Sequence, residues 1–236
     1  MASYKTKLIV LSRVDFSESD RILTVYSLAY GLHKIIAKGS RKTLSHLGGK
    51  IEPYYCLFAN LVEGKSFDII TDIQILSTYE NIRKKLPSLR ICYQISRLIK
   101  AIFHEKEPHQ KIFYLVEQTL NLLDKKDNAL AWPIFLSGLI NELGYCPNLD
   151  ICAICRNKLT LPINWSPSEG FCHQECFSTG ILLEDANAKL LKLIISQEEI
   201  IMNLKLDQSN LIAITGYLED YLVYHTGIKM EKIRQE

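Results

Sequence analysis

Several features that would assign this chain to a common functional class are missing from its sequence. The 236 residues contain no run of about eighteen apolar residues, which argues against a membrane-spanning helix. They also contain no GxxxxGK[ST] or GxGxxG phosphate loop, no GxSxG nucleophile elbow and no HExxH zinc motif. The histidines outside the cysteine-rich region are scattered and are not paired with a nucleophile. We therefore expect a protein without a catalytic centre.

The N-terminus and the cysteines indicate the cellular compartment. The apolar stretch at residues 8–11 is too short for a signal-peptide core, and no small-residue cleavage site follows it. Seven cysteines is an odd number, and four of them lie between Cys152 and Cys176. Such a cluster is more typical of an intracellular metal site than of disulfides. We expect a cytoplasmic protein.

The net charge of the chain is close to zero, but charges of one sign are concentrated in particular segments. The whole chain carries a formal net charge of +2. Residues 21–51 nevertheless hold six basic side chains and no carboxylate, and residues 83–111 hold eight basic side chains against two acidic ones. The remainder is strongly acidic. Segregation of this kind predicts an electrostatically patterned surface.

The first eighty residues favour β-strands. Runs of β-branched and apolar residues occur at 6–14, 22–28, 33–38, 54–62 and 68–76, with turn residues between them. The last run alternates, which predicts that Ile69 and Ile73 face one way and Asp68 the other. Five strands of even length in so short a segment suit a small closed barrel better than a sandwich.

After Pro87 the apolar spacing changes to the helical period of about 3.6. The pattern predicts a helix that begins here, followed by helices at 110–124, 129–143, 186–202 and 208–226. Strands followed by helices indicate an α+β protein of two domains. We expect a barrel domain at 1–80 and a mainly helical domain at 81–236, with the cysteine-rich segment 145–180 inserted in the latter.

Two cysteine pairs form the clearest chemical motif. Cys152 and Cys155 make a CxxC, and after sixteen intervening residues come Cys172 and Cys176, with three residues between them. Two such pairs can close a tetrahedron of thiolates around one Zn²⁺. We predict a zinc finger that holds one structural Zn²⁺ through Cys152, Cys155, Cys172 and Cys176. Because the second pair is wider than CxxC, His173 is an alternative ligand to Cys172.

A catalytic zinc is not favoured by this arrangement. Nucleobase deaminases carry HxE upstream of PCxxC, whereas here His173 and Glu175 follow the CxxC and no proline precedes Cys152. A four-cysteine site also leaves no open coordination position for water. The simpler alternative to any metal is a set of four reduced thiols in a loop region.

The first basic segment runs from a predicted strand into a loop rich in glycine and serine at residues 39–49. Such loops, with aromatic residues nearby, are where small barrels hold single-stranded nucleic acid, because cations neutralise phosphates and rings stack on bases. A solvated charged face is the competing interpretation. We predict that DNA is bound by the cations of this face, namely Arg13, Arg21, Lys34, Lys38, Arg41, Lys42 and Lys50.

The order of these motifs resembles a known family. The resemblance is carried by residues 10–26, Gly31, and residues 37–42, 48–53, 143–155 and 171–177. These segments look like the corresponding parts of the bacterial recombination mediator RecO family, and the likeness covers essentially the whole chain. One departure is the second cysteine pair, which is usually CxxC in that family.

The resemblance implies an N-terminal OB-fold, a helical C-terminal domain and an inserted zinc finger. It also implies binding of single- and double-stranded DNA, annealing of complementary strands and, with RecR, loading of RecA onto strands coated by single-strand-binding protein. Lys38, Arg41 and Lys42 would be the family's DNA contacts. RecF is a further partner in the same pathway, no membrane partner is implied, and the location would be the cytoplasm at the nucleoid.

The second basic segment, residues 83–111, and the zinc finger leave alternatives open. Three alternatives are open for the helix in that segment: it extends the DNA-binding surface, it receives the acidic C-terminal tail of single-strand-binding protein, or it is a solvated face. The other reading of the whole chain is a zinc-finger regulator or scaffold acting on duplex DNA. That reading needs a recognition helix with base-reading side chains, and the helices near the finger carry few of them.

Overall fold

The computed structural model describes residues 2–125, 129–196 and 207–230, and the chain divides into two compact units, Met1–Lys126 and Asp127–Glu236. Each unit has its own core, and each is described by itself below. In the part of the chain that is described, no helix has the length and apolar character needed to cross a membrane.

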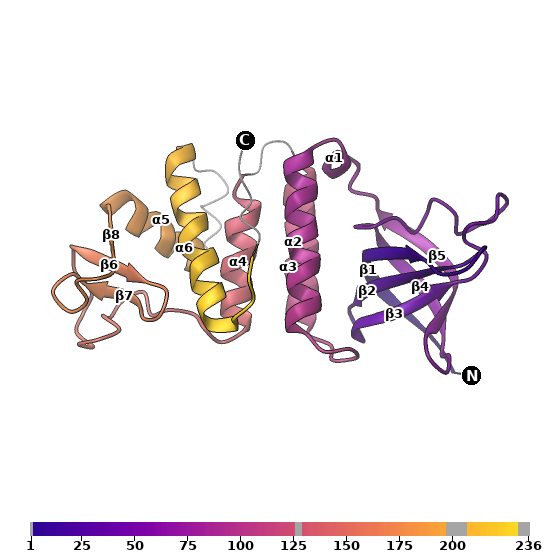
Figure 1. The fold of residues 1–236 in the computed structure, drawn as a ribbon, viewed down its shortest axis with the longest axis horizontal. Coiled ribbons are helices and arrows are strands. Elements are labelled where there is room, and N and C mark those ends of the chain that lie inside the picture. The colour runs from indigo at the N-terminus through magenta and orange to yellow at the C-terminus, as the bar shows by residue number, and fades with distance from the viewer. Residues whose placement is uncertain (1, 126–128, 197–206, 231–236) are drawn as a thin grey trace. The chain divides into compact units, whose positions relative to one another are not determined.

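The first unit begins with a closed barrel of five strands (Figure 1). The strands are hydrogen-bonded in the order β1-β2-β3-β5-β4, and β4 pairs with β1 to close the ring. This arrangement confirms the predicted small barrel and is of the OB-fold type. The strands are β1 (Ser3–Asp15), β2 (Arg21–Ser27), β3 (Gly31–Ala37), β4 (Cys56–Val62) and β5 (Asp68–Ser77).

Alternate side chains of the strands point inward and fill the barrel with aliphatic residues such as Leu23 and Ile35, both fully buried. Two further core residues, Leu47 and Ile51, come from the long β3–β4 loop. Their burial anchors the second half of that loop to the barrel. The β3–β4 loop, residues 38–55, is therefore held to the barrel by β3 at its start and by these two side chains in its second half.

β1 pairs with both of its neighbours in the barrel, with β4 through its first half and with β2 through its second half. The register shifts between Val10 and Ser12, which is the irregularity expected where a strand bends to close a barrel. The bend lets one thirteen-residue strand belong to both sides of the ring.

The predicted alternation of β5 is wrong in the first half of the strand, where Asp68 and Ile70 are buried and Ile70, not Ile69, joins the core with Ile73, because the register with β4 shifts between Asn60 and Leu61. Asp68 is only 7% exposed, and its carboxylate accepts a hydrogen bond from the Tyr4 hydroxyl at 2.5 Å. Its other oxygen accepts the Gly64 N–H at 3.3 Å. A buried carboxylate that receives hydrogen bonds is tolerated, and it holds the β4–β5 turn to the first strand.

Three helices complete the first unit: α1 (Glu80–Arg83), α2 (Leu86–Ile102) and α3 (Gln110–Asp124). α2 buries the apolar stripe predicted from its spacing, including Ile95 and Leu98. The Ser96 hydroxyl of α2 donates to the Leu11 carbonyl of β1 at 3.2 Å, and the Lys7 ammonium of β1 lies 2.5 Å from the Glu117 carboxylate of α3. The helices are thus bonded to the barrel.

Gly31 allows the α2–α3 connection to approach β3. Its φ is +63°, and a Cβ at this position would lie 2.1 Å from the Glu107 carbonyl oxygen. Both the left-handed backbone and the close contact require glycine. Beside it the Lys106 N–H donates to the Leu32 carbonyl at 2.8 Å, so the connection is fixed to the strand.

His33 of β3 provides a test of the barrel's pH dependence. The side chain is 2% exposed, and burial lowers its pKa, although a hydrogen bond between Nδ1 and the Gly31 carbonyl acts the other way. Below an unfolded-state pKa of about 6.5, the unfolded chain takes up a proton that the folded barrel does not, so stability falls with decreasing pH until the lower folded-state pKa is reached.

In urea unfolding, His33→Phe is expected to remove this contribution, which has a slope of up to about 1.4 kcal/mol per pH unit below pH 6.5. The exposed His104→Gln substitution is the control and should keep the wild-type slope. Equal slopes in wild type and His33→Phe would contradict the prediction.

Among its described residues, the second unit has three helices, α4 (Ala131–Glu142), α5 (Asp185–Ser196) and α6 (Gln208–Thr226), and a small sheet. The sheet has the order β7-β6-β8, with β6 (Ile163–Ser166), β7 (Gly170–His173) and β8 (Ile181–Leu183). Trp132 of α4 donates its indole N–H to Glu219 of α6 at 2.8 Å, and both side chains are buried.

The predicted helices agree with the observed ones, except that residues 197–202 of the fourth prediction lie outside the described residues. The predicted domain boundary near residue 80 lies where strands give way to helices. The division into compact units instead places α1–α3 with the barrel. Hydrogen bonds such as that between Ser96 and Leu11 are the physical reason for this grouping. The division into 1–80, 81–236 and an insertion at 145–180 stays a prediction.

Candidate metal centre and nucleic-acid interface

The first cysteine pair lies on a tight backbone turn at the start of the small sheet. The Arg156 N–H donates to the Cys152 carbonyl at 3.0 Å, and the Cys152 N–H donates to the Asn157 carbonyl at 2.8 Å. Arg156 itself has a φ of +64°. This reversal folds the chain back so that Cys152 and Cys155 present their thiols to the same side, as a zinc knuckle does.

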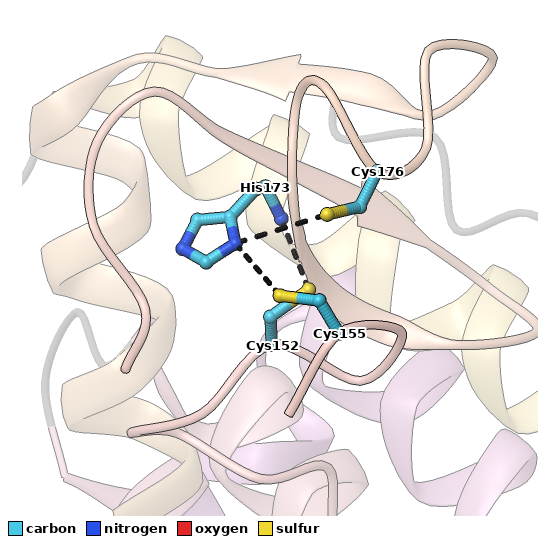
Figure 2. A group of neighbouring side chains, drawn as sticks. All are labelled: Cys152, Cys155, His173 and Cys176. Carbon is cyan, nitrogen blue, oxygen red and sulfur yellow. Dashed lines mark hydrogen bonds between the residues drawn. The ribbon is translucent and has the colours of Figure 1, made fainter. Parts of the chain in front are cut away.

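The second half of the group lies at the end of β7. His173 is the last residue of this strand, and its carbonyl accepts the N–H groups of Cys176 at 3.0 Å and Phe177 at 3.2 Å. This turn returns Cys176 to the side of the His173 ring (Figure 2). Two turns from different parts of the sequence thereby face one another.

Four side chains offer metal-ligating atoms that all lie within 4.8 Å of one another, those of Cys152, Cys155, His173 and Cys176 (Figure 2). His173 Nδ1 lies 3.4 Å from Cys155 Sγ and 3.9 Å from Cys176 Sγ. Ligands about 2.3 Å from a tetrahedral Zn²⁺ are separated by roughly 3.8 Å. The residues present therefore fit a zinc ion in number, chemistry and spacing.

Cys172 is not part of this group of four. It is fully buried, and burial raises the pKa of its thiol to about 11. Its thiol nevertheless interacts with the thiol of Cys152, which also raises the pKa of Cys172, while the alternation of β7 places the His173 side chain on the other side of the strand. The structure brings together the alternative ligand His173, and the four-cysteine set stays a prediction.

Hydrogen bonds tune the thiols and orient the histidine. Burial raises the pKa of Cys152, but backbone N–H groups, among them that of His173, outweigh it and lower the pKa to about 6. A hydrogen bond with Cys155 raises the pKa of Cys176 to about 11. His173 Nε2 lies 3.1 Å from the Lys158 carbonyl oxygen and 3.2 Å from the Thr160 backbone nitrogen, and these contacts hold the ring with Nδ1 toward the thiols. A proton on Nε2, donated to the Lys158 carbonyl, would leave Nδ1 free to bind a metal, whereas a hydrogen bond from the Thr160 N–H requires Nε2 without its proton.

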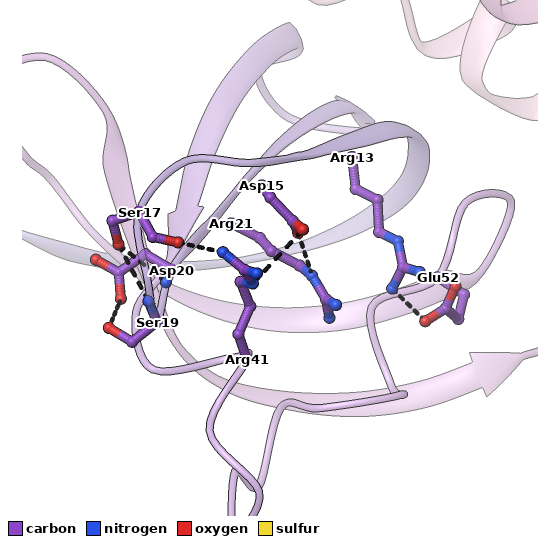
Figure 3. Close-up of polar contacts among 8 residues, drawn as sticks. All are labelled: Arg13, Asp15, Ser17, Ser19, Asp20, Arg21, Arg41 and Glu52. Carbon is purple, nitrogen blue, oxygen red and sulfur yellow. Dashed lines mark hydrogen bonds and ion pairs between the residues drawn. The ribbon is translucent and has the colours of Figure 1, made fainter.

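Several of the predicted DNA-binding cations form ion pairs with acids that the charge pattern of the sequence does not reveal. Arg13 forms an ion pair with Glu52, and Arg21 Nε lies 3.0 Å from an Asp15 carboxylate oxygen (Figure 3). The other Asp15 oxygen lies 3.5 Å from Arg41 Nε, and the hydrogen bond from Arg21 lowers the pKa of Asp15. Both acids lie just outside the acid-free segment 21–51, and folding places them on the basic face.

The remaining four cations also differ in whether an acidic side chain lies beside them. Lys34 Nζ lies 3.3 Å from a Glu105 carboxylate oxygen, and both side chains are about half exposed, so the pair contributes little. Lys38, Lys42 and Lys50 are exposed, and within the described part of the chain none of them has an ion-pair partner. These three ammonium groups are the ones available to phosphates.

Arg41 joins two loops instead of extending into solvent. Its backbone N–H donates to the Ser19 carbonyl at 3.0 Å, and its Nη1 donates to the Ser17 carbonyl at 2.5 Å (Figure 3). Close by, the Gly39 N–H donates to Asp20 at 2.8 Å and lowers the pKa of that carboxyl. The start of the basic β3–β4 loop is therefore fixed to the β1–β2 loop.

Sequence reasoning missed one more cation of the barrel. Lys65 lies in the β4–β5 turn, is exposed, and has no ion-pair partner among the residues that the structure covers. A lysine in the predicted hairpin turn after Gly64 was a sufficient signal, but it lay outside the two basic segments. The structure adds Lys65 to the exposed cations at barrel loops.

Comparison with known proteins gives a consistent result. Two family models, described as Recombination protein O N terminal and Recombination protein O C terminal, match residues 1–79 and 84–233. A protein named DNA repair protein RecO from Caldanaerobacter subterraneus subsp. tengcongensis is 27% identical over 93% of this chain and 88% of its own length. One of the same name from Dehalococcoides mccartyi is 32% identical over 85% of this chain and 81% of its own length.

The barrel, the helices and these relatives define a protein of DNA repair and recombination. The chain belongs to the RecO family, as both halves of its sequence match the family models. The resemblance noted from the sequence motifs is thereby confirmed.

Proposed function

We propose that this chain is a non-enzymatic recombination mediator that binds single- and double-stranded DNA and anneals complementary single strands. The observation that carries the proposal is a set of exposed ammonium groups on the barrel loops of a member of the RecO family, none of which has an ion-pair partner among the described residues: Lys38, Lys42, Lys50 and Lys65. Arg13, Arg21, Lys34 and Arg41 add positive charge that is partly neutralised by neighbouring acids.

The proposed mechanism is electrostatic. Two DNA strands repel one another through their phosphates, and cations on a rigid loop lower that repulsion while the bases pair. Each single-strand phosphate contact contributes about 0.7 to the slope of log affinity against log salt concentration. The tethering of the loop by Arg41 at one end and Leu47 and Ile51 at the other keeps the cations in place without further ordering on binding.

The partners are proposed from the family. With RecR, and in one pathway with RecF, the chain would help load RecA onto strands covered by single-strand-binding protein. α2 carries Arg90 and Lys100 at exposed positions together with the exposed Tyr93. A helix with cations beside apolar side chains suits either an acidic, apolar tail of single-strand-binding protein or an extension of the DNA-binding surface.

We further propose that one structural Zn²⁺ is held by Cys152, Cys155 and Cys176, with His173 as the fourth ligand in place of Cys172. When bound, the ion would cross-link the two turns that carry these residues. Four protein ligands leave no coordination position open for water, so the role is structural.

The function is tested by the annealing of complementary oligonucleotides coated with single-strand-binding protein. The chain is expected to accelerate annealing by at least about tenfold at low salt, and less as salt rises, because screening weakens the phosphate contacts. A reaction with naked strands separates annealing itself from displacement of the coating protein. Rates identical with and without the chain, on both naked and coated strands, would contradict the proposal.

A further inference from the structure

Two phenylalanine rings, those of the exposed Phe16 and the partly buried Phe67, form a contact between barrel loops. Phe16 follows the last residue of β1, Phe67 precedes the first residue of β5, and their ring centroids lie 6.5 Å apart at an interplanar angle of 78°. Phe16 is 57% exposed. An aromatic ring with most of its surface in water gains little from core burial, so its position calls for another explanation.

Both rings are carried on loops that hydrogen bonds hold in shape. The Phe16 N–H donates to the Asp20 carbonyl at 3.1 Å, and the Asp20 N–H donates to the Ser17 hydroxyl at 3.1 Å. On the other side the Gly64 N–H donates to Asp68, the residue that follows Phe67, and the Tyr4 hydroxyl fixes the same carboxylate. A ligand meeting these rings would find them already positioned.

The topology places the two loops on either side of one pair of strands. β1 is the neighbour of β2, and β5 is the neighbour of β3, with Ile35 of β3 opposite Asp68 of β5. In the closed ring β4 also lies between β5 and β1, so the contact between Phe16 and Phe67 joins the β1–β2 and β4–β5 loops at one end of the barrel. In barrels of this type the β2–β3 face and these two loops hold oligonucleotides.

The charge around the rings is mixed and includes two exposed cations. Asp15, next to Phe16, is paired with Arg21 and Arg41, and Glu18 is an exposed acid in the same loop. Lys38 directly follows β3, and Lys65 lies two residues before Phe67; both are exposed, and neither has an ion-pair partner in the described residues. Aromatic faces among unpaired cations are the combination by which single strands are held without sequence preference. An apolar protein partner would bring no charge to complement these ammonium groups.

We propose that Phe16 and Phe67 form a stacking site for unpaired bases of single-stranded DNA, with Lys38 and Lys65 neutralising neighbouring phosphates. This inference rests on the proposed DNA-binding function and deepens it. A phenyl ring offers no hydrogen-bonding group, so it contacts the face of a base and leaves the pairing edge free. Stacking of this kind holds a strand while it remains able to anneal.

The test compares two oligomers of equal length and charge, oligo(dT) and a strand of abasic sites, by fluorescence anisotropy. Phe16→Ala and Phe67→Ala are each expected to weaken binding of oligo(dT) by about 5- to 100-fold, the range measured for loss of one stacked base. Binding of the abasic strand should be unchanged, because the phosphate contacts remain. Leu44→Ala, which removes an apolar side chain that is 98% exposed on the basic loop, is the matched control.

A gain-of-signal variant keeps the test independent of folding. Trp132 and Trp165 are buried in the other unit, at 2% and 0% exposure. In Phe16→Trp, the new exposed indole should be quenched by oligo(dT) and not by the abasic strand, with affinity close to wild type.

Three results would overturn the stacking site: equal weakening on both strands, wild-type affinity of both alanine variants for oligo(dT), or equal quenching by both strands. They leave the proposed function standing if the wild-type chain binds the two oligomers. Failure of the wild-type chain to bind either oligomer would instead overturn DNA binding itself.

Discussion

Reversing the charge of Lys38 and Lys42 together is expected to weaken binding of single-stranded DNA by about 100-fold at low salt, with each reversal contributing roughly tenfold. Both ammonium groups are exposed and have no acid partner in the part of the chain that the structure describes. Each substitution removes one phosphate contact and adds a like charge. The slope of log affinity against log salt should fall by about 1.4, the value for two lost single-strand contacts.

The control changes the net charge by the same amount elsewhere. Lys125→Glu with Lys229→Glu reverses two exposed lysines, one directly after α3 and one after α6. If binding depends on the barrel loops, this pair should retain affinity within about threefold at physiological salt, since neither lysine belongs to those loops and exposed charges are screened. Equal losses in the two double variants would show that overall charge, and not these loops, governs binding.

Arg41→Glu is expected to behave differently from the lysine variants. Its guanidinium binds the Ser17 carbonyl and faces Asp15, so reversal would break the link between two loops as well as remove a cation. The midpoint of thermal unfolding should fall together with the affinity, whereas Lys38→Glu should leave it near wild type. A wild-type midpoint in Arg41→Glu would show that the contacts of this side chain contribute nothing to loop stability.

The sequence predicts the elements well because their periodicity is strong. Alternation such as that of Leu23 and Val25 within β2, and the helical stripe of Ile95 and Leu98, follow directly from which side must be buried. The first residue of β5 escaped this reasoning. Asp68 is buried because Tyr4, sixty-four positions away in sequence, supplies its hydrogen bond, and no local pattern contains that information.

The sites are harder to predict because they depend on pairs that only folding brings together. A charge count over residues 21–51 excluded Asp15 and Glu52 by a few positions, yet Asp15 pairs with Arg21 of that segment and Glu52 pairs with Arg13 of the predicted basic face. The same limitation applies to the metal group. Spacing favours Cys172, with His173 as the alternative, and only folding shows that the His173 ring lies with the thiols of Cys152, Cys155 and Cys176.

The ligand set can be settled by comparing two neighbouring substitutions. His173→Ala is expected to weaken zinc binding by roughly 10²-fold, because 10–16 kcal/mol of apparent binding energy shared over four ligands assigns about 3 kcal/mol to each. Cys172→Ala is expected to keep one ion per chain at wild-type affinity, since its thiol is not among the four gathered ligands. Competition with a chromophoric chelator at fixed pH measures both affinities.

His173→Cys provides the positive control, because a thiolate at the same position should restore the binding that His173→Ala loses. If Cys172→Ala loses zinc as completely as Cys152→Ser, and His173→Ala does not, the ligands are the four cysteines, with Cys172 bound through the side on which its thiol already meets Cys152.

Removal of the metal should mainly destabilise the small sheet. β6, β7 and β8 have four, four and three residues, and isolated sheets of this size are marginally stable in water. Chelation is therefore expected to abolish amide-exchange protection in these strands first. Protection in α4 and α6 should persist, because the buried hydrogen bond between Trp132 and Glu219 and the packing of these helices do not pass through the ligands. Simultaneous loss of protection in sheet and helices would mean that the metal group stabilises the whole second unit.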